Sequence, residues 1–193
     1  MVAKIISGRE VAETILTTDL KNKVEELNKK NINPKLIVIL VGDMKASASY
    51  VAQKEKFAVK AGIESDVMRF EASVTESEIL AEIDKINSDN NIHGVIVQLP
   101  LPDHISVAKV LNRIHPSKDV DGFTPTNVGK LFLGEDTLVS CTPKGIMQML
   151  ASTKTDLNGK NVTVVGRSNI VGKPVAILCL QQNATVTMCH SRT

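Results

Sequence analysis

The only tyrosine of the chain, Tyr50, lies four residues before Lys54 within the stretch ASASYVAQKEK. In an α-helix, side chains four residues apart lie on one face, and Ser47, three residues before Tyr50, joins that face. The stretch is rich in Ala, Gln, Lys and Glu, which predicts a helix. A lysine in a partly dry pocket can lose its proton near neutral pH and act as a general base. On spacing alone, however, a solvated lysine and a half-buried tyrosine on an amphipathic helix are the more common case.

Three other polar residues lie at positions where a binding site could form, one after an apolar run and two within a turn-forming stretch. Gln98 comes directly after the apolar run GVIV, and Asp119 and Asp121 lie in KDVDGF. A glutamine here could orient Lys54, although a polar residue at a strand end is usually only solvated. Most Asp-Gly pairs form turns, because Asp bonds its own backbone and Gly adopts positive φ. A carboxylate in such a turn could also accept paired N–H groups of a heterocycle.

A glycine-containing turn near the C-terminus has features of a phosphate site. In VTVVGRSNIVGKPVAILCL, Gly166 ends an apolar strand and Gly172 starts a helix, with Pro174 tolerated in its first turn. Backbone N–H groups at such a helix start can bind a phosphate with help from the helix dipole. The spacing is not Gly-x-Gly-x-x-Gly, so the dinucleotide pattern is only partly met. Dinucleotide binding and a plain strand-to-helix turn both remain open at this point.

The end of the next strand indicates which dinucleotide would fit. Folds that bind NAD usually end their second strand with an acidic residue that holds the ribose 2′-hydroxyl. Here the strand ATVTMC is followed by His190, Ser191, Arg192 and Thr193, without a carboxylate. Together with Arg167 in the first turn, this favours the additional phosphate of NADP. The alternative is that Arg192 is simply a solvated loop residue.

The elements that must position these residues alternate between strands and helices. Helices are predicted from Gly8 to Lys29, from the Tyr50 stretch to Gly62, over TESEILAEIDKINS with its Thr75-x-x-Glu78 capping box, and from about Ser106 to Ile114. The strands between them are PKLIVILVG, IESDVMRF and HGVIVQLPLP. This alternation predicts a parallel sheet covered by helices, in which ligands bind beyond the carboxyl ends of the strands. Residues 42–47 and 98–102 therefore meet at one edge of the sheet.

A second unit follows the turn-rich loop HPSKDVDGFTPTN. Beyond it, a helix over TPKGIMQMLAST precedes the order strand, glycine turn, helix and strand, which is part of a Rossmann fold. We therefore predict an α/β protein with two domains. Residues 1–122 form an N-terminal catalytic domain around a parallel sheet, and residues 123–193 form a partial NAD(P)-binding Rossmann domain.

Composition excludes several classes of function. The chain has 193 residues, a net charge of +2, 42% hydrophobic residues and only 3% aromatic residues, which gives no reason to expect nucleic acid binding. Cys141, Cys179 and Cys189 lack zinc-ligand spacing, so we expect reduced, buried thiols and no metal site. The N-terminus has no signal-peptide pattern, and no apolar run approaches the roughly 18 residues of a membrane span. We expect a cytoplasmic protein without membrane contacts.

Four stretches together carry a family resemblance. SASYVAQK, GVIVQLPLP, KDVDGF and GRSNIVGKP closely resemble the motifs of the bifunctional methylenetetrahydrofolate dehydrogenase/cyclohydrolase family. CTPKGIM and ATVTMCHSRT extend the resemblance over essentially the whole chain, in the order of the family. The resemblance implies NADP-dependent oxidation of 5,10-methylenetetrahydrofolate to the methenyl form and hydrolysis to 10-formyltetrahydrofolate in one-carbon metabolism. It also implies a homodimer formed through the cofactor domain, and no metal.

The resemblance also implies roles for individual residues. Lys54 would be the catalytic residue, held by Gln98, while Tyr50 would pack on the folate near the reacting carbon. Asp121 would bind the pterin N–H groups. Two further residues would line the folate pocket, Ser47 and Leu99. The residues that would hold NADP are Gly166, Arg167, Ser168, Ile170, His190 and Ser191.

The chain departs from the family at its end. Family members continue for roughly a further third of their length, so we expect this chain to be a fragment or a truncated form that binds NADP weakly. Short-chain dehydrogenases also use Tyr-x-x-x-Lys, but their glycine-rich turn precedes that pair, whereas here the order is reversed. A non-catalytic module that retains folate, or only associates with partners, is the alternative from a different class of function.

Overall fold

The computed structural model describes residues 5–43 and 45–193, without the side chains of residues 45–48, and it divides into two compact units. One unit is Ile15–Val120, which is called the sheet unit below. The other contains Asp121–Thr193 together with the helix that ends at Thr14, and is called the cofactor unit. The α/β class predicted from the sequence is confirmed.

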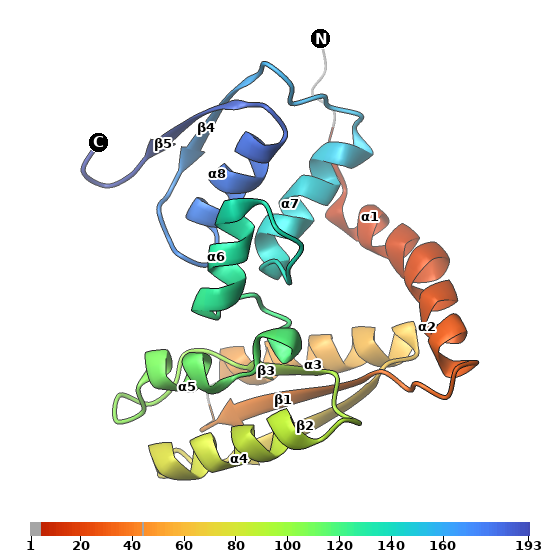
Figure 1. Cartoon of the computed structure of the whole chain (residues 1–193), viewed down its shortest axis with the longest axis vertical. Coiled ribbons are helices and arrows are strands. Elements are labelled where there is room, and N and C mark those ends of the chain that lie inside the picture. Colours follow the sequence, from red (N-terminus) through yellow and green to blue (C-terminus); the bar gives the residue numbers. More distant parts are fainter. Residues whose placement is uncertain (1–4, 44) are drawn as a thin grey trace. The chain divides into compact units, whose positions relative to one another are not determined.

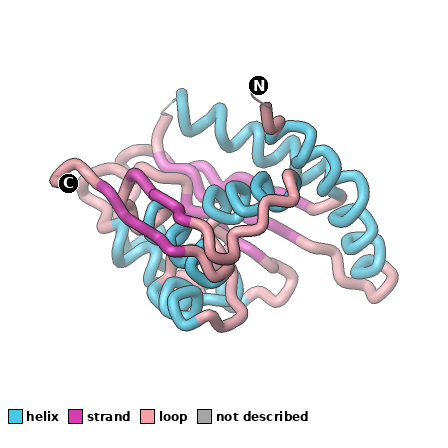
Figure 2. Tube along the Cα trace, turned by 90° about the horizontal axis from the view of Figure 1, so that it is seen from above, coloured by secondary structure: helices cyan, strands magenta, loops and turns pink. Residues whose placement is uncertain are grey.

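The sheet unit is built on three parallel strands in the order β2-β1-β3 (Figure 1). They are β1 (Lys35–Val41), β2 (Glu64–Phe70) and β3 (Gly94–Val97). Figure 2 shows the strands of the chain in magenta and the helices in cyan. The central strand β1 is buried almost throughout, as expected for a strand with a helix layer on each face. Its apolar run KLIVILV explains that position.

Helices cover both faces of this sheet. Side chains alternate along a strand, so β1 supplies one apolar set to α3 (Lys45–Ala61) and the other to α4 (Glu76–Ser88) and α5 (Val107–Arg113). Each fully buried aliphatic side chain contributes about 1.5–3 kcal/mol relative to exposure. On the α3 side the buried residues are Val38, Leu40, Val51 and Ile96. On the α4 and α5 side they include Ile37, Ile39, Val41, Ile79, Ile83, Ile86, Val110 and Ile114.

The helix predicted from Gly8 to Lys29 is present but changes its winding. It consists of α1 (Gly8–Thr14), a π-helical segment η1 (Ile15–Leu20) and α2 (Lys21–Asn28). The first part belongs to the cofactor unit and packs on α7, whereas the rest belongs to the sheet unit. α3 ends before Gly62, which has a φ of 78° and thus the left-handed cap conformation that was predicted.

The predicted capping box starts α4. Thr75 donates its backbone N–H to Glu78 Oε2 at 2.8 Å, and its hydroxyl oxygen accepts the backbone N–H of Glu78 at 3.3 Å. Near the same end, Glu76 accepts from Lys109 Nζ at 2.6 Å and from the backbone N–H of Ser106 at 2.8 Å. These bonds fix the start of α4 and join it to α5.

Four carboxylates at the ends and on the surface of α4 have lowered pKa values, and this predicts a loss of stability in acid. The pKa of Glu76 is lowered mainly by Lys109, that of Glu78 by Thr75, that of Asp84 by Arg113 and that of Asp89 by the backbone of Asn91. A lowered folded-state pKa adds stability above the unfolded-state pKa, and that stability is lost as the pH falls through the folded-state pKa. We expect the free energy of unfolding in urea to be constant near neutrality and to fall below about pH 4.

The substitution Asp84→Asn should flatten this pH dependence, because it removes one of the four groups. Asp103→Asn is the matched control, since Asp103 is exposed and has no partner within the described part of the chain. Equal unfolding free energies for the unsubstituted protein at pH 7 and pH 3 would contradict the prediction.

The cofactor unit contains a parallel strand pair, β4 (Asn161–Val165) and β5 (Thr185–Cys189), joined by α8 (Gly172–Gln181). One face of the pair packs on α8, and Val165 on the other face is 84% exposed. α7 (Cys141–Ser152) also packs against α8. The small buried core consists of Leu157, Val175, Cys179 and Ala184.

The segment HPSKDVDGFTPTN, predicted to be a loop, contains the start of a helix. After the short 3-10 turn η2 (Pro116–Lys118), α6 begins at Pro125 and runs to Leu133. The hydroxyl of Thr124 accepts the backbone N–H of Asn127 at 3.4 Å, and Gly134 ends the helix with a φ of 77°. Proline is favourable at the first position of a helix because its missing N–H is not needed there.

The three cysteines are free, and their environments differ. Cys179 is buried, which raises the pKa of its thiol, whereas Cys189 is partly buried and Cys141 is exposed. The expectation of buried thiols is therefore wrong for Cys141, because it lies at the surface-facing start of α7. Among the described helices, none is long and apolar enough to cross a membrane.

Candidate functional site

Tyr50 and Lys54 lie one turn apart on α3, just beyond the carboxyl end of β1. Val51 lies on the side of α3 that faces the sheet and is fully buried there, which fixes the rotation of the helix about its axis. As a result, Tyr50 is turned outward and is 66% exposed, while Lys54 is partly buried. Ser47 belongs to the same helix, but its side chain lies outside the described residues.

The ammonium group of Lys54 contacts the residue that ends the neighbouring strand. Lys54 Nζ donates to Gln98 Oε1 at 3.2 Å. The other end of the Gln98 amide donates from Nε2 to the carbonyl oxygen of Leu99 at 2.9 Å, and its backbone N–H donates to Ile39 O at 2.9 Å. The amide therefore has both ends engaged, with its oxygen toward Lys54. The structure brings together two residues that the sequence separates by 44 positions.

The strands of the sheet unit place Leu99 and the first residues of KDVDG. Leu99 is partly buried against the core, and the Leu99-Pro100 peptide bond is cis. Asp119 is only 1% exposed, and its backbone forms an isolated bridge with Val95 of β3. Asp121 begins the cofactor unit two residues later and is partly buried. Within that unit, Cys141 Sγ lies 3.9 Å from Asp121 Oδ1 and donates to it.

The turn after β4 is shaped by two glycines. The N–H of Gly166 donates to Cys189 O at 2.8 Å, and its φ is 140°. A Cβ placed on Gly166 would meet nothing within 4 Å, so the turn leaves open space there. A Cβ placed on Gly172 would lie 2.5 Å from the carbonyl oxygen of Gly166. The start of α8 therefore touches the turn directly, and only glycine allows that approach.

Ser168 caps the start of α8. Its Oγ accepts the N–H groups of Val171 and Gly172, both at 3.1 Å, and its carbonyl accepts the N–H of Lys173 at 3.0 Å. Three of the N–H groups expected to bind a phosphate are thus already engaged. Over the described ranges, the N–H groups of Arg167 and Ser168 have no hydrogen-bond partner. These two remain as backbone donors for an anion.

The residues after β5 lie beside this turn, because Val165 and Cys189 are paired in the parallel register. His190 donates its N–H to Thr193 Oγ1 at 2.8 Å, and its Nδ1 accepts the N–H of Arg192 at 3.0 Å. Ser191 and both guanidinium groups, those of Arg167 and Arg192, are exposed at this edge. None of the four residues from His190 to Thr193 carries a carboxylate side chain. The donor set therefore suits a phosphate.

Ile170, another residue predicted to contact the cofactor, lies in the same turn. Its side chain is 42% exposed, and its carbonyl oxygen accepts a hydrogen bond from Ser140 Oγ at 2.7 Å. Ser140 immediately precedes α7 and is buried. This bond ties the turn to the start of α7 and leaves the Ile170 side chain available for an apolar contact.

Two family descriptions match the chain. The catalytic domain of tetrahydrofolate dehydrogenase/cyclohydrolase matches residues 6–121, and the NAD(P)-binding domain of the same enzyme matches residues 140–193. The chain belongs to the tetrahydrofolate dehydrogenase/cyclohydrolase family. The resemblance inferred from its four motifs is confirmed.

Curated relatives of this family match the chain over its whole length. The bifunctional protein FolD of Bacillus licheniformis is 56% identical over 193 residues, which is all of this chain and 68% of the relative. The bifunctional protein FolD of Bacillus subtilis is 55% identical over 193 residues, which is again all of this chain and 68% of the relative.

Solved structures of the family agree with the fold. The bifunctional enzyme FolD from Campylobacter jejuni has a TM-score of 0.96 at 44% identity, covering 98% of this chain and 67% of that chain. FolD from Trypanosoma brucei, complexed with NADP cofactor and inhibitor, has a TM-score of 0.92 at 37% identity. The match covers 99% of this chain and 65% of that chain.

Proposed function

We propose that this chain oxidises 5,10-methylenetetrahydrofolate to the 5,10-methenyl form with NADP and hydrolyses that product to 10-formyltetrahydrofolate, as part of one-carbon metabolism. The observation that carries the proposal is the Lys54–Gln98 contact of 3.2 Å beyond the carboxyl ends of parallel strands, in a chain of this family. Ligands of open parallel sheets bind at this position.

Lys54 serves as the base of the hydrolysis. The methenyl group is cationic and electrophilic, so water needs only to be positioned and deprotonated. A cationic ligand next to Lys54 favours its uncharged amine, which can take that proton. Gln98 holds the amine in place through its Oε1, and Tyr50 packs on the folate from the exposed side of α3. These three residues act in the sheet unit.

The remaining substrate contacts have simpler roles. Asp121 accepts the N–H groups of the pterin, because a carboxylate can accept two parallel hydrogen bonds. Ser47 and Leu99 line the folate pocket. Domain 1–122 would thus bind the folate, and domain 123–193 would bind the cofactor.

NADP would be held at the turn between β4 and α8. When bound, it would supply the nicotinamide that accepts the hydride. The free N–H groups of Arg167 and Ser168 would bind phosphate oxygens at the positive end of α8. Arg167 would favour NADP over NAD because it can pair with the additional phosphate, and none of residues 190–193 is an acid that could hold a ribose hydroxyl. The other cofactor contacts are Gly166, Ile170, His190 and Ser191.

Two absorbance assays test the function. Purified protein mixed with methenyltetrahydrofolate should consume it faster than buffer alone, and protein with methylenetetrahydrofolate and NADP⁺ should form NADPH. Hydrolysis at the buffer rate would contradict the role of the sheet unit, and NADPH formation absent with ample substrate would contradict the role of the cofactor unit.

We also propose that the protein is a cytoplasmic homodimer formed through the cofactor unit. Support comes from exposed apolar residues of that unit, including Phe132, Leu133 and Val165, which are each at least 70% exposed. Unpaired edges of short sheets favour association. Sedimentation equilibrium should give twice the mass of the chain, and a single-chain mass at all concentrations would refute the dimer.

A further inference from the structure

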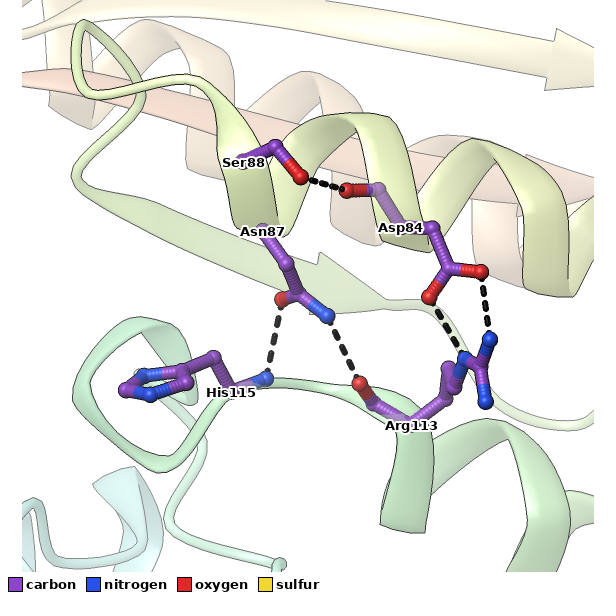
Figure 3. A network of polar contacts seen from close by, with 5 residues as sticks. All are labelled: Asp84, Asn87, Ser88, Arg113 and His115. Atoms are coloured by element: carbon purple, nitrogen blue, oxygen red, sulfur yellow. Dashed lines mark hydrogen bonds and ion pairs between the residues drawn. The ribbon is translucent and has the colours of Figure 1, made fainter.

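The segment that leads from α5 into the KDVDG turn is fastened to the C-terminal end of α4. Figure 3 shows the Asn87 side chain between the two elements. Asn87 Oδ1 accepts the backbone N–H of His115 at 2.9 Å, and Nδ2 donates to Arg113 O at 2.8 Å. One side-chain amide thus pairs with two backbone groups of the segment, much as a neighbouring strand would.

An ion pair strengthens the same junction. Arg113 Nε and Nη2 donate to the two carboxylate oxygens of Asp84, each at 2.5 Å (Figure 3). The pair is bidentate, which restricts the orientation of both side chains. Ser88 Oγ donates back to the carbonyl oxygen of Asp84, one turn earlier on α4, at 2.8 Å.

Lys118, the first residue of KDVDG, forms the second attachment. Its Nζ donates to Ile86 O at 2.6 Å and to Asp89 O at 2.7 Å. The last carbonyls of a helix lack intrahelical partners and lie at its negative end, so a cation is favourable there. Lys118 is partly buried here, and this burial lowers the pKa of its ammonium.

The two residues after Lys118 are held by the sheet. Asp119 is bridged to Val95, and Val120 packs on Gly94 so closely that a Cβ on Gly94 would lie 2.6 Å from Val120 Cγ1. Asp121 is the next residue along the chain. The backbone from Arg113 to Val120, which directly precedes Asp121, is therefore held by α4 and by β3 within the sheet unit.

We propose that Asn87 and Lys118 are positioning residues of the folate site, which act by holding segment 113–119 and so the start of the KDVDG turn. The proposal rests on the function proposed above for Asp121. α4 and α5 are already joined by core residues such as Ile83 and Val110, and by the Lys109–Glu76 pair. Losing the Asn87 or Lys118 contacts should therefore loosen the turn and leave the core intact.

Variants of Lys118 give the sharpest test. Lys118→Met removes both hydrogen bonds and keeps the length of the side chain, whereas Lys118→Arg keeps a cation that can reach two carbonyls. Lys109→Met is the matched control, because Lys109 also joins α4 and α5 but at the other end of α4, at 2.6 Å from Glu76 Oε1. Asn87→Ala tests the other attachment, because it removes the hydrogen bonds to His115 N and Arg113 O.

The expected result has a kinetic and a structural part. In Lys118→Met and Asn87→Ala, KM for methenyltetrahydrofolate should rise about 10-fold with kcat nearly unchanged, because substrate binding is weakened in both the ground and transition states. Lys118→Arg should recover most of the affinity, and Lys109→Met should keep the original KM. Amide hydrogen exchange without folate should be faster at residues 115–122 in Lys118→Met and Asn87→Ala only.

Three contrary results are possible, and each one contradicts a different part of the argument. Exchange at residues 115–122 that is no faster in Lys118→Met than in Lys109→Met refutes the attachment itself, whether or not the protein hydrolyses folate. Faster exchange with an unchanged KM refutes the link to the folate site. A lack of hydrolysis by the unsubstituted protein contradicts the proposed function instead, and the exchange data then show separately whether the attachment exists.

Discussion

Lys54→Met should lower the rate of methenyltetrahydrofolate hydrolysis about 10²–10⁴-fold, the usual effect of removing a general base. Methionine has an unbranched side chain of similar length, so the packing of α3 on the sheet should be preserved. What is lost is the amine and its 3.2 Å hydrogen bond to Gln98. The measurement is kcat/KM for hydrolysis at constant pH, followed by the absorbance of the methenyl compound.

Lys56→Met is the control for this substitution. Lys56 is on the same helix and exposed, but a residue two positions away points to a different side of the helix. The Lys56→Met protein should therefore hydrolyse methenyltetrahydrofolate at the full rate. Both variants should unfold at the temperature of the unsubstituted protein, which separates a chemical defect from a folding defect. Equal hydrolysis rates for Lys54→Met and the unsubstituted protein would remove Lys54 from the mechanism.

The sheet unit could be predicted well because its local signals agree with its tertiary structure. The β1 run LIVIL is apolar on both faces, which is what a central parallel strand requires. The Thr75 capping box and Gly62 mark helix ends by chemistry that needs no distant partner. Agreement between local preference and fold is typical of sequences that specify one structure.

α6 was missed for a physical reason. Its first residues lie in a stretch of Gly, Thr, Pro and Asn, which usually forms turns. The same residues can start a helix: Thr124 caps it, Pro125 occupies its first position and Gly134 ends it. For a helix of nine residues, the apolar repeat is too short to outweigh the turn signal.

The candidate site shows where sequence reasoning stops. The parallel order predicts that the Lys54 helix and Gln98 share one edge, and the structure brings their side chains together. The contacts of Ser168 with the α8 N–H groups and of Lys118 with the end of α4 were not predicted. Both depend on which of several possible partners a flexible polar side chain reaches, and the Lys118 contacts span about 30 positions of the chain.

Gly172→Ala should distort the turn between β4 and α8 and weaken NADP binding. The new Cβ would lie 2.5 Å from Gly166 O, 2.7 Å from Gly166 C and 3.0 Å from Arg167 N, all of which are backbone atoms. Backbone cannot rotate away as a side chain can, so the turn must open, at a cost of about 1–3 kcal/mol. Opening displaces the N–H groups of Arg167 and Ser168, and NADP affinity should fall at least about 10-fold.

Gly145→Ala supplies the matched comparison. Gly145 lies inside α7, and a Cβ there would meet nothing within 4 Å. Alanine is the better helix former, so this variant should gain about 0.5–1 kcal/mol of unfolding free energy and bind NADP as before. Urea unfolding followed by circular dichroism, with NADP titration by calorimetry, measures both effects. A loss of NADP affinity in Gly172→Ala with unchanged affinity in Gly145→Ala would locate the phosphate contact at the turn between β4 and α8. A Gly172→Ala protein with unchanged stability and NADP affinity would show that the close approach of α8 to Gly166 does not shape the site.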